Sequence, residues 1–432
     1  MASRLELPIN PAPPEVMHID LNSAFAMAEQ QANPLLRGRP VGVTNRRNDY
    51  AICITASYEA RRHGVGIGTR LREARLRAPG FVMVESDPAK YHYVNRCMRE
   101  IFESYSSRAY MKSVDEGVID FRGMRNLLQG RSLEDIGREI KQRVRDEVGD
   151  YMTVNVGIGQ NHWLAKVAAG FMKPDGLYVI GRDNLEAVYG LLRLTDLPYI
   201  KVRNAARLCQ AGIGTPLDFL RAPEVVLRRQ VFCSIMGRHW YLKLRGYETE
   251  APYDIRTVGR SYVLEHRTAD PAEIAALLMR ACWKVARRLR THELAARGLW
   301  LQFGYARSNT VPVQATHTSR RYGWPSWRGR KLYATAVTRG DQLYERAFEL
   351  FRSSPAGQVL TSIVITAYDL VPATCDQLSL PGFDDARPVR LESAVQAIND
   401  RYGELTIAPA LAFKARNPMP DKVPFGSVRY FD

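Results

Sequence analysis

The stretch MHIDLN at residues 17–22 and the stretch SVDEGVID at residues 113–120 decide how this chain folds. In each stretch, an acidic residue ends or interrupts a short apolar run that is typical of a buried strand. A carboxylate at the end of a core strand is costly unless it is paired or binds a cation. If the two strands are neighbours, Asp20, Asp115 and Glu116 would form an all-oxygen site suited to Mg²⁺. The alternative is that both stretches are hairpin ends whose acids are solvated.

Strands and helices alternate around these two stretches. We expect strands at 16–19, 41–44, 51–56, 152–158 and 177–180, a strand–turn–strand unit at 111–121, and helices at 23–31, 58–63, 91–106, 132–148 and 161–172. This alternation predicts an α+β sheet through about residue 184. Residues 185–248 are expected to be mainly helical. A second α+β unit is expected at 259–370, where Asp270-Pro271 predicts the start of a helix.

The composition indicates a globular, multidomain protein. The chain has 432 residues, of which 46% are hydrophobic and 25% charged, so it is too long for one ordinary core. It contains no uninterrupted apolar run of about 18 residues, and its N-terminus has no apolar signal region, so neither a membrane span nor secretion is predicted. Six scattered cysteines without a C-x-x-C spacing predict reduced thiols, mostly in the core, and a cytoplasmic location.

The charge of the chain favours a polyanionic partner. The formal net charge is +16, and residues 301–340 carry seven Lys or Arg and no Asp or Glu. Aromatic residues are interleaved with these cations, which suits contact with a phosphate backbone. The basic residues predicted to bind nucleic acid are Arg307, Arg320, Arg321, Arg328, Arg330 and Lys331. The alternative is a solvated basic face that has no partner.

Two Mg²⁺ ions at such a site can hold the attacking and leaving oxygens of an in-line phosphoryl transfer. This reaction also needs cations on the triphosphate, and two other places in the chain could supply them. Tyr58 and Arg61 are three residues apart, so on a helix they share a face that can bind a phosphate tail. Lys166 lies in an expected helix that follows a glycine-containing turn at 157–161, although the spacing is not that of a Walker A loop. Each place taken alone is more often a solvated helix face.

Together and in this order, the motifs resemble the Y-family translesion DNA polymerases, the UmuC/DinB branch. The matching motifs are HIDLNSAF at 18–25 with Glu29, RPVGV at 39–43, SYEAR at 57–61 through Gly64-Val65, SxDExxxD at 113–120, VGIG at 156–159 to LAK at 164–166, and KPxG at 173–176. The resemblance covers nearly the whole chain. It implies an α+β multidomain fold, a right-hand polymerase with a ferredoxin-like palm, small fingers, a helical thumb and an α+β little-finger domain.

The resemblance also implies domain boundaries. They are 1–26 and 85–184 for the palm, 27–84 for the fingers, 185–248 for the thumb, 249–258 for a linker, 259–370 for the little finger and 371–432 for a C-terminal tail. The basic stretch at 301–340 then belongs to the little finger, which grips template–primer DNA.

By motif match, Asp20, Asp115 and Glu116 would be the catalytic, metal-binding carboxylates, and the carbonyl of Leu21 would add a ligand. Three residues would hold the incoming deoxynucleoside triphosphate, namely Tyr58, Arg61 and Lys166. Phe25 falls where the family keeps a bulky residue that crowds a ribose 2′-OH. The implied enzyme is an error-prone, template-directed DNA polymerase that uses two Mg²⁺ ions and bypasses lesions. The alternatives are a non-catalytic family scaffold and a DNA-binding repair adaptor.

Four positions depart from the family pattern. Asn22 stands where many relatives carry an aspartate, and Gly117 stands where alanine is usual. Ala24 replaces a usual aromatic residue beside Phe25, which could enlarge the nucleotide pocket. The thumb turn at 199–204 lacks the usual paired glycines, so its DNA grip could be altered.

Near the C-terminus, CDQLSLPGF at 375–383 resembles the peptide by which bacterial polymerases dock on the sliding clamp. Such a peptide sinks apolar side chains into a pocket. The residues that would do so here, with the glutamine that opens the motif, are Gln377, Leu378, Leu380 and Phe383. Pro381 sits where phenylalanine is usual, so an ordinary linker is the alternative. The resemblance also allows a UmuD-like subunit or a RecA-like recombinase as a partner, and a role in the SOS response.

Overall fold

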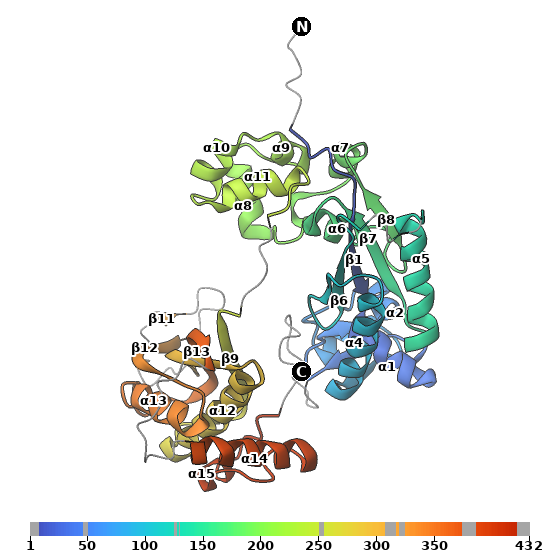
Figure 1. The fold of residues 1–432 in the computed structure, drawn as a ribbon. Coiled ribbons are helices and arrows are strands. Elements are labelled where there is room, and N and C mark those ends of the chain that lie inside the picture. Colours follow the sequence, from blue (N-terminus) through green and yellow to red (C-terminus); the bar gives the residue numbers. More distant parts are fainter. Residues whose placement is uncertain are drawn as a thin grey trace. The chain divides into compact units, whose positions relative to one another are not determined.

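A computed structural model describes residues 8–45, 51–124, 128, 130–249, 255–306, 317–318, 325–373 and 386–420 (Figure 1). The chain forms two compact units, one made mainly of residues up to Pro252 and one that begins at Tyr253. Across the described ranges, no helix combines the length and the apolar character that crossing a membrane requires.

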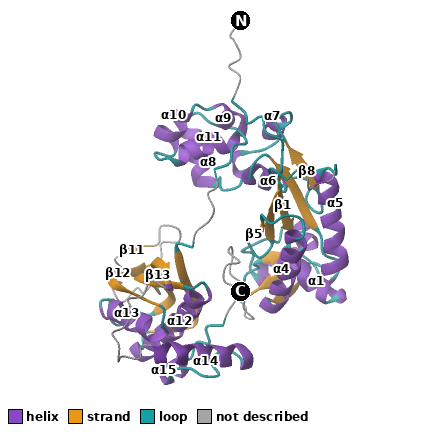
Figure 2. Ribbon diagram, in the orientation of Figure 1, coloured by secondary structure: helices purple, strands orange, loops and turns teal. Residues whose placement is uncertain are grey.

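The first unit is built on a five-stranded sheet in the order β5-β6-β1-β7-β8 (Figure 2). The strands are β1 (Val16–Leu21), β5 (Ala109–Met111), β6 (Glu116–Asp120), β7 (Val154–Gly159) and β8 (Leu177–Ile180). The central strand β1 is antiparallel to both β6 and β7, while β7 and β8 are parallel. The two acid-bearing stretches are therefore adjacent, as the sequence analysis expects.

Side-chain alternation gives β1 two different faces. Met17, Ile19 and Leu21 lie in the apolar core together with residues of α4 (Pro88–Glu103) and α5 (Leu133–Arg143). Val16 packs on the opposite face with Val118 and with Ala165 of α6 (His162–Ala168). Because side chains alternate, His18 and Asp20 also lie on the α6 side of the sheet.

A three-stranded sheet with the order β3-β2-β4 follows the first strand and helix of the chain. The elements of this region are α1 (Ala24–Ala32), η1 (Pro34–Leu36), β2 (Val41–Thr44), β3 (Thr55–Ala56), α2 (Tyr58–Arg62), α3 (Leu71–Arg77) and β4 (Val82–Glu85). The strand expected at 51–56 is shorter than predicted. Ile52 makes one isolated bridge with Arg70, and regular pairing with β2 is confined to β3.

Residues 185–249 are mainly helical, as predicted. The elements are α7 (Leu185–Gly190), η4 (Leu194–Asp196), α8 (Val202–Gln210), α9 (Pro216–Arg221), α10 (Glu224–Val226), η5 (Leu227–Val231) and α11 (Met236–Leu244). The turn before α8 contains no glycine. Tyr199 adopts the left-handed conformation there, with a φ of 70°. Asn204 donates a side-chain hydrogen bond of 3.3 Å to the Tyr199 carbonyl. A non-glycine residue in this conformation is uncommon, which marks the turn as atypical.

The second unit is a five-stranded sheet in the order β11-β12-β10-β13-β9. Its elements are β9 (Thr257–Thr268), α12 (Pro271–Thr291), β10 (Leu294–Tyr305), β11 (His317–Thr318), β12 (Pro325–Val337), α13 (Gly340–Arg352), β13 (Leu360–Pro372), α14 (Ala386–Tyr402) and α15 (Ala410–Phe413). Asp270 caps α12 by accepting a hydrogen bond from the Ala272 N–H, as Asp270-Pro271 predicts.

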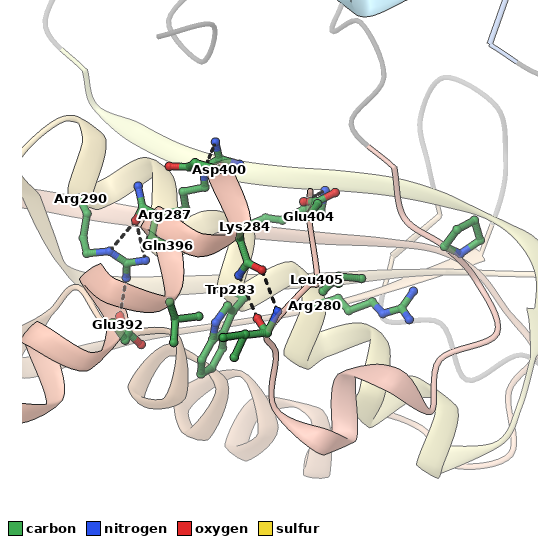
Figure 3. A pocket seen from close by; sticks show the side chains of 14 residues that line it. Arg280, Trp283, Lys284, Arg287, Arg290, Glu392, Gln396, Asp400, Glu404 and Leu405 are labelled. Carbon is green, nitrogen blue, oxygen red and sulfur yellow. Dashed lines mark hydrogen bonds and ion pairs between the residues drawn. The ribbon is translucent and has the colours of Figure 1, made fainter. Parts of the chain in front are cut away.

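Helix α14 lies in the stretch assigned to the C-terminal tail, and it packs on α12 through a ladder of ion pairs (Figure 3). Arg287 contacts Asp400 at 2.8 Å, Arg290 pairs with Glu392, and Lys284 pairs with Glu404. Gln396 accepts a further hydrogen bond from Arg290 at 3.0 Å. These three cations of α12 are therefore neutralised within the unit.

The described cysteines are free thiols, but most of them are not in the core. Cys53 and Cys282 are buried, Cys97 is half-buried, and Cys209 and Cys233 are exposed. The prediction of mostly core cysteines is therefore wrong for the helical region, where both thiols face solvent.

Gly117, on the α4 side of β6, has no room for a side chain. A Cβ at this position would lie 2.6 Å from Cε2 of Phe102, whose side chain is fully buried. We therefore expect Gly117→Ala to lower the free energy of unfolding by about 1–3 kcal/mol through overpacking. Denaturant unfolding measures this difference.

Gly66→Ala is the matched control, because a Cβ at Gly66 meets open space. Combining Gly117→Ala with Phe102→Leu should recover part of the loss. Equal stabilities of the wild type and Gly117→Ala would contradict the packing argument.

Candidate active site

Three acidic residues meet where β1 ends and β6 begins. Asp20 is paired in register with Glu116 across the two strands, so both side chains lie on the α6 face of the sheet. The Leu21 N–H donates a 2.8 Å hydrogen bond to the Asp115 carbonyl, which ties the turn before β6 to the end of β1. The structure thus brings Asp20, Leu21, Asp115 and Glu116 together.

Asp115 is the acid of this cluster whose pKa is raised. Burial raises the pKa of its carboxyl, and the negative charges of Asp20 and Glu116 raise it further. A 2.6 Å hydrogen bond from the Ser113 hydroxyl opposes this rise. The net result is a raised pKa for Asp115.

Glu116 is held by two donors on the same oxygen. Nε2 of His18 lies 3.2 Å from Oε2 of Glu116, and the Lys166 ammonium pairs with that oxygen too. Burial favours a higher pKa for Glu116, but the hydrogen bond from His18 and the charge of Lys166 outweigh it and lower the pKa to about 2. Burial lowers the pKa of His18 itself, so the imidazole is neutral and donates through Nε2.

Two glycines bring Lys166 to this site. A Cβ on Gly157 would lie 2.1 Å from the Ala169 nitrogen, and a Cβ on Gly159 would lie 2.4 Å from the Ala165 nitrogen. Only glycine at these positions lets α6 lie directly against β7. Asn161 caps the helix by accepting a 2.7 Å hydrogen bond from the Leu164 N–H. Both glycines lie in β7 rather than in the expected turn, and this close approach explains their Gly-x-Gly spacing.

Lys173 is a site residue that the sequence analysis did not identify. Its ammonium pairs with the carboxylate of Asp20. The loop that carries it is anchored by Asn155 of β7, which is fully buried and pairs in register with Asp20. The Asn155 side chain donates to the carbonyls of Ala169 and Phe171 and accepts from the Gly176 N–H. The sequence feature that could have identified Lys173 is the KPxG motif at 173–176, which begins with this lysine.

Tyr58 and Arg61 share a face of α2, as their spacing predicts. The Arg61 guanidinium lies 5.1 Å from the centre of the Tyr58 ring. The Tyr58 hydroxyl donates a 3.2 Å hydrogen bond to Oδ1 of Asn22, which directly follows β1. Burial raises the pKa of Tyr58, so the hydroxyl stays protonated. Asn22 therefore connects α2 to the acidic end of the sheet.

Phe25 is buried in the first turn of α1, just after the acidic end of β1. Its ring stacks on the ring of Tyr91 from α4, with centroids 4.5 Å apart. Phe25 is predicted as a site residue from the sequence, but Tyr91 is not.

The three acids fit a hard divalent cation by the chemistry of their donors. Within the described ranges, no group of three or more His, Cys, Asp or Glu side chains is already arranged as a metal site. Instead, Asp20 and Glu116 each hold a lysine ammonium. Both carboxylates thus already lie beside a positive charge, and carboxylate oxygens are the ligands that Mg²⁺ prefers.

The predicted nucleic-acid residues of the second unit are divided between two faces of the sheet. Arg328 and Arg330 on β12 are exposed, and they pair in register with Gln302 and Trp300 of β10. Lys331 alternates to the side that faces α13 and pairs with Glu349. The structure therefore places Lys331 away from Arg328 and Arg330.

Several predicted residues lie outside the described residues. Among the basic residues these are Arg307, Arg320 and Arg321, and in the clamp-like peptide they are Gln377, Leu378, Leu380 and Phe383.

Two family models match the chain. The impB/mucB/samB family matches residues 19–170, and the impB/mucB/samB family C-terminal domain matches residues 255–380. Both acid-bearing strands lie within or next to the first match, and the sheet of the second unit lies largely within the second.

The chain is similar to proteins named DNA polymerase IV. It is 31% identical to that of Moorella thermoacetica, over 92% of this chain and 96% of the relative, and 30% identical to that of Pelotomaculum thermopropionicum, over 92% and 95%. Among solved structures it is similar to a Y-family DNA polymerase chimera, with a TM-score of 0.68 and 22% identity over 82% of this chain and 99% of that chain. It is also similar to DinB from Sulfolobus solfataricus, with a TM-score of 0.54 and 22% identity over 82% and 98%. These likenesses confirm the expected multidomain polymerase fold.

Proposed function

The chain belongs to the impB/mucB/samB family, the Y-family DNA polymerases of the DinB type, and from that premise we propose that it is an error-prone polymerase that works with two Mg²⁺ ions. As a DNA-directed DNA polymerase it acts in translesion synthesis. The observation that carries the proposal is the meeting of Asp20, Asp115 and Glu116 beside two lysines.

The acids and the lysines would divide the work between them. Asp20, Asp115, Glu116 and the Leu21 carbonyl would hold the ions, which when bound polarise the phosphate and neutralise the charge that develops on it. Lys166 and Lys173, which now neutralise the acids, would turn to the triphosphate together with Tyr58 and Arg61. Catalysis then consists of holding the primer 3′-OH in line with the α-phosphate and stabilising charge as pyrophosphate leaves.

We assign the parts of the chain in the same way as the sequence analysis. The palm would comprise 1–26 and 85–184, the fingers 27–84, the thumb 185–248 and the little finger 259–370. The face of the second sheet that carries Arg328 and Arg330 would contact the DNA backbone. Docking on a sliding clamp through the peptide at 375–383, and assistance by a UmuD-like subunit or a RecA-like recombinase, stay predictions.

Primer extension with Mg²⁺ on an undamaged template and on a lesion-bearing template tests the function. The proposed polymerase extends both and misinserts readily. A protein that binds the primer–template but adds no nucleotide would be the scaffold or the adaptor instead.

Asp115→Asn and Glu116→Gln should each reduce nucleotide addition by at least about two to three orders of magnitude, because each removes charge where the phosphate reacts. DNA binding should stay nearly unchanged. Asp120→Asn is the matched control, since Asp120 lies at the far end of β6 and is paired with Arg122. Extension at the wild-type rate by either site variant would rule out this active site.

Phe25→Ala should raise incorporation of ribonucleotides relative to deoxynucleotides, because a bulky side chain at this place rejects one hydroxyl by crowding it. The measurement is kcat/KM for a deoxynucleotide and its matching ribonucleotide, compared as a ratio. Ala24→Phe tests the neighbouring departure from the family and should tighten the pocket. An unchanged ratio in Phe25→Ala would place sugar selection elsewhere.

Binding of primer–template should weaken with salt, with a log–log slope of about −0.7 to −0.9 per phosphate contact. Replacing Arg328 and Arg330 with Glu should flatten this slope by about one to two. Lys331→Gln should leave it unchanged, because Lys331 faces α13 and pairs with Glu349. Fluorescence anisotropy titrations at several salt concentrations give the slopes. A flattening by Lys331→Gln alone would place the DNA on the opposite face.

A further inference from the structure

The ring of Phe25 rests on a partner that is itself fixed at two points. Phe25 and Glu29 are four residues apart on α1, so they share one helix face. Tyr91 of α4 meets both of them. Its ring stacks on Phe25 with centroids 4.5 Å apart and an interplanar angle of 28°, and its hydroxyl donates a 2.8 Å hydrogen bond to Oε1 of Glu29.

Glu29 is a buried carboxylate whose charge is used to hold this arrangement. It is 2% exposed, and Lys90 places its ammonium 2.8 Å from Oε2. A buried charge is tolerated only when it is paired and hydrogen-bonded. If Glu29 lost its contacts with Lys90 and the Tyr91 hydroxyl, an unpaired charge would remain in the core, which is unfavourable.

The other side of the Tyr91 hydroxyl is occupied as well. The Asp87 N–H donates to this oxygen at 3.3 Å, just before α4 begins. Burial raises the pKa of Tyr91 far above the physiological range, so the hydroxyl keeps its proton and remains a donor to Glu29. The Tyr91 ring is thus held in place by its hydroxyl while its face supports Phe25.

The residue beside Phe25 offers little support. Ala24, its neighbour in the chain, has a single methyl group. Supporting the Phe25 ring by stacking therefore falls to Tyr91, a contact that is worth more than the apolar area alone would give.

We propose that Tyr91 is a positioning residue for sugar selection, which holds the Phe25 ring in the orientation that rejects a 2′-OH. Glu29 and Lys90 act through Tyr91 by fixing its hydroxyl. The inference rests on the proposed role of Phe25 and deepens it. A residue that only packed the core would change stability and would slow deoxynucleotide and ribonucleotide addition alike.

The test compares kcat/KM for a deoxynucleotide and its matching ribonucleotide in the full-length protein. Tyr91→Leu removes the stack and should reduce discrimination about 3- to 10-fold, the factor that corresponds to an aromatic pair. Tyr91→Phe keeps the ring but frees it from Glu29, so it should give a smaller loss. Lys90→Met, which weakens the hold of Glu29, should act in the same direction as Tyr91→Phe.

Tyr93→Leu is the matched control. Tyr93 lies on the same helix, is 52% exposed and is covered by the guanidinium of Arg96. Its replacement should leave discrimination unchanged.

A double-mutant cycle separates the possible failures. In a Phe25→Ala background, Tyr91→Leu should cause no further loss of discrimination, because there is no longer a ring to hold. If Phe25→Ala alone leaves discrimination unchanged, the proposed role of Phe25 is wrong. If Phe25→Ala lowers discrimination but Tyr91→Leu and Tyr91→Phe do not, Phe25 selects the sugar without this support and the inference is overturned. Should Tyr91→Leu fail to fold, the isosteric Tyr91→Phe decides between these outcomes.

Discussion

Carboxylates crowded on one face of a sheet need positive charge beside them, and the first unit is organised around that requirement. Asp20 and Glu116 oppose each other on neighbouring strands, and Asp115 sits at the adjoining turn with a raised pKa because it is buried beside both. Two lysines from outside these strands neutralise the cluster. Carboxylates of this kind suit divalent cations, and the lysine ammonium groups beside them suit a polyphosphate.

The two lysines reach the acids because the segments that carry them are held close to β7. Helix α6 lies directly on β7 because Gly157 and Gly159 carry no Cβ, and this brings Lys166 to Glu116. The loop with Lys173 is held by the buried Asn155, which satisfies three backbone groups at once. The position of both cations therefore depends on the two glycines and the asparagine.

In the second unit, ion pairs with acidic residues of the same unit determine which basic side chains are available to a binding partner. Counting basic residues between 301 and 340 overestimates that number, because Lys331 pairs with Glu349 and Arg339 pairs with Asp341. Arg287 and Arg290 of α12 are likewise neutralised by Asp400 and Glu392 of α14 (Figure 3). Arg328 and Arg330 lie on the other face of the sheet, beside Trp300 and Gln302, where a phosphate backbone could reach them.

The sequence by itself was sufficient for whatever depends on spacing within one element. It predicted the two acid-bearing strands, the shared face of Tyr58 and Arg61, and the cap at Asp270, because strand and helix periods determine these from local residues. It did not reveal that Lys173 reaches Asp20 or that His18 holds Glu116. These two contacts join residues 153 and 98 positions apart. Sheet order and helix packing create such contacts, and no local period encodes them, so only the tertiary structure could decide them.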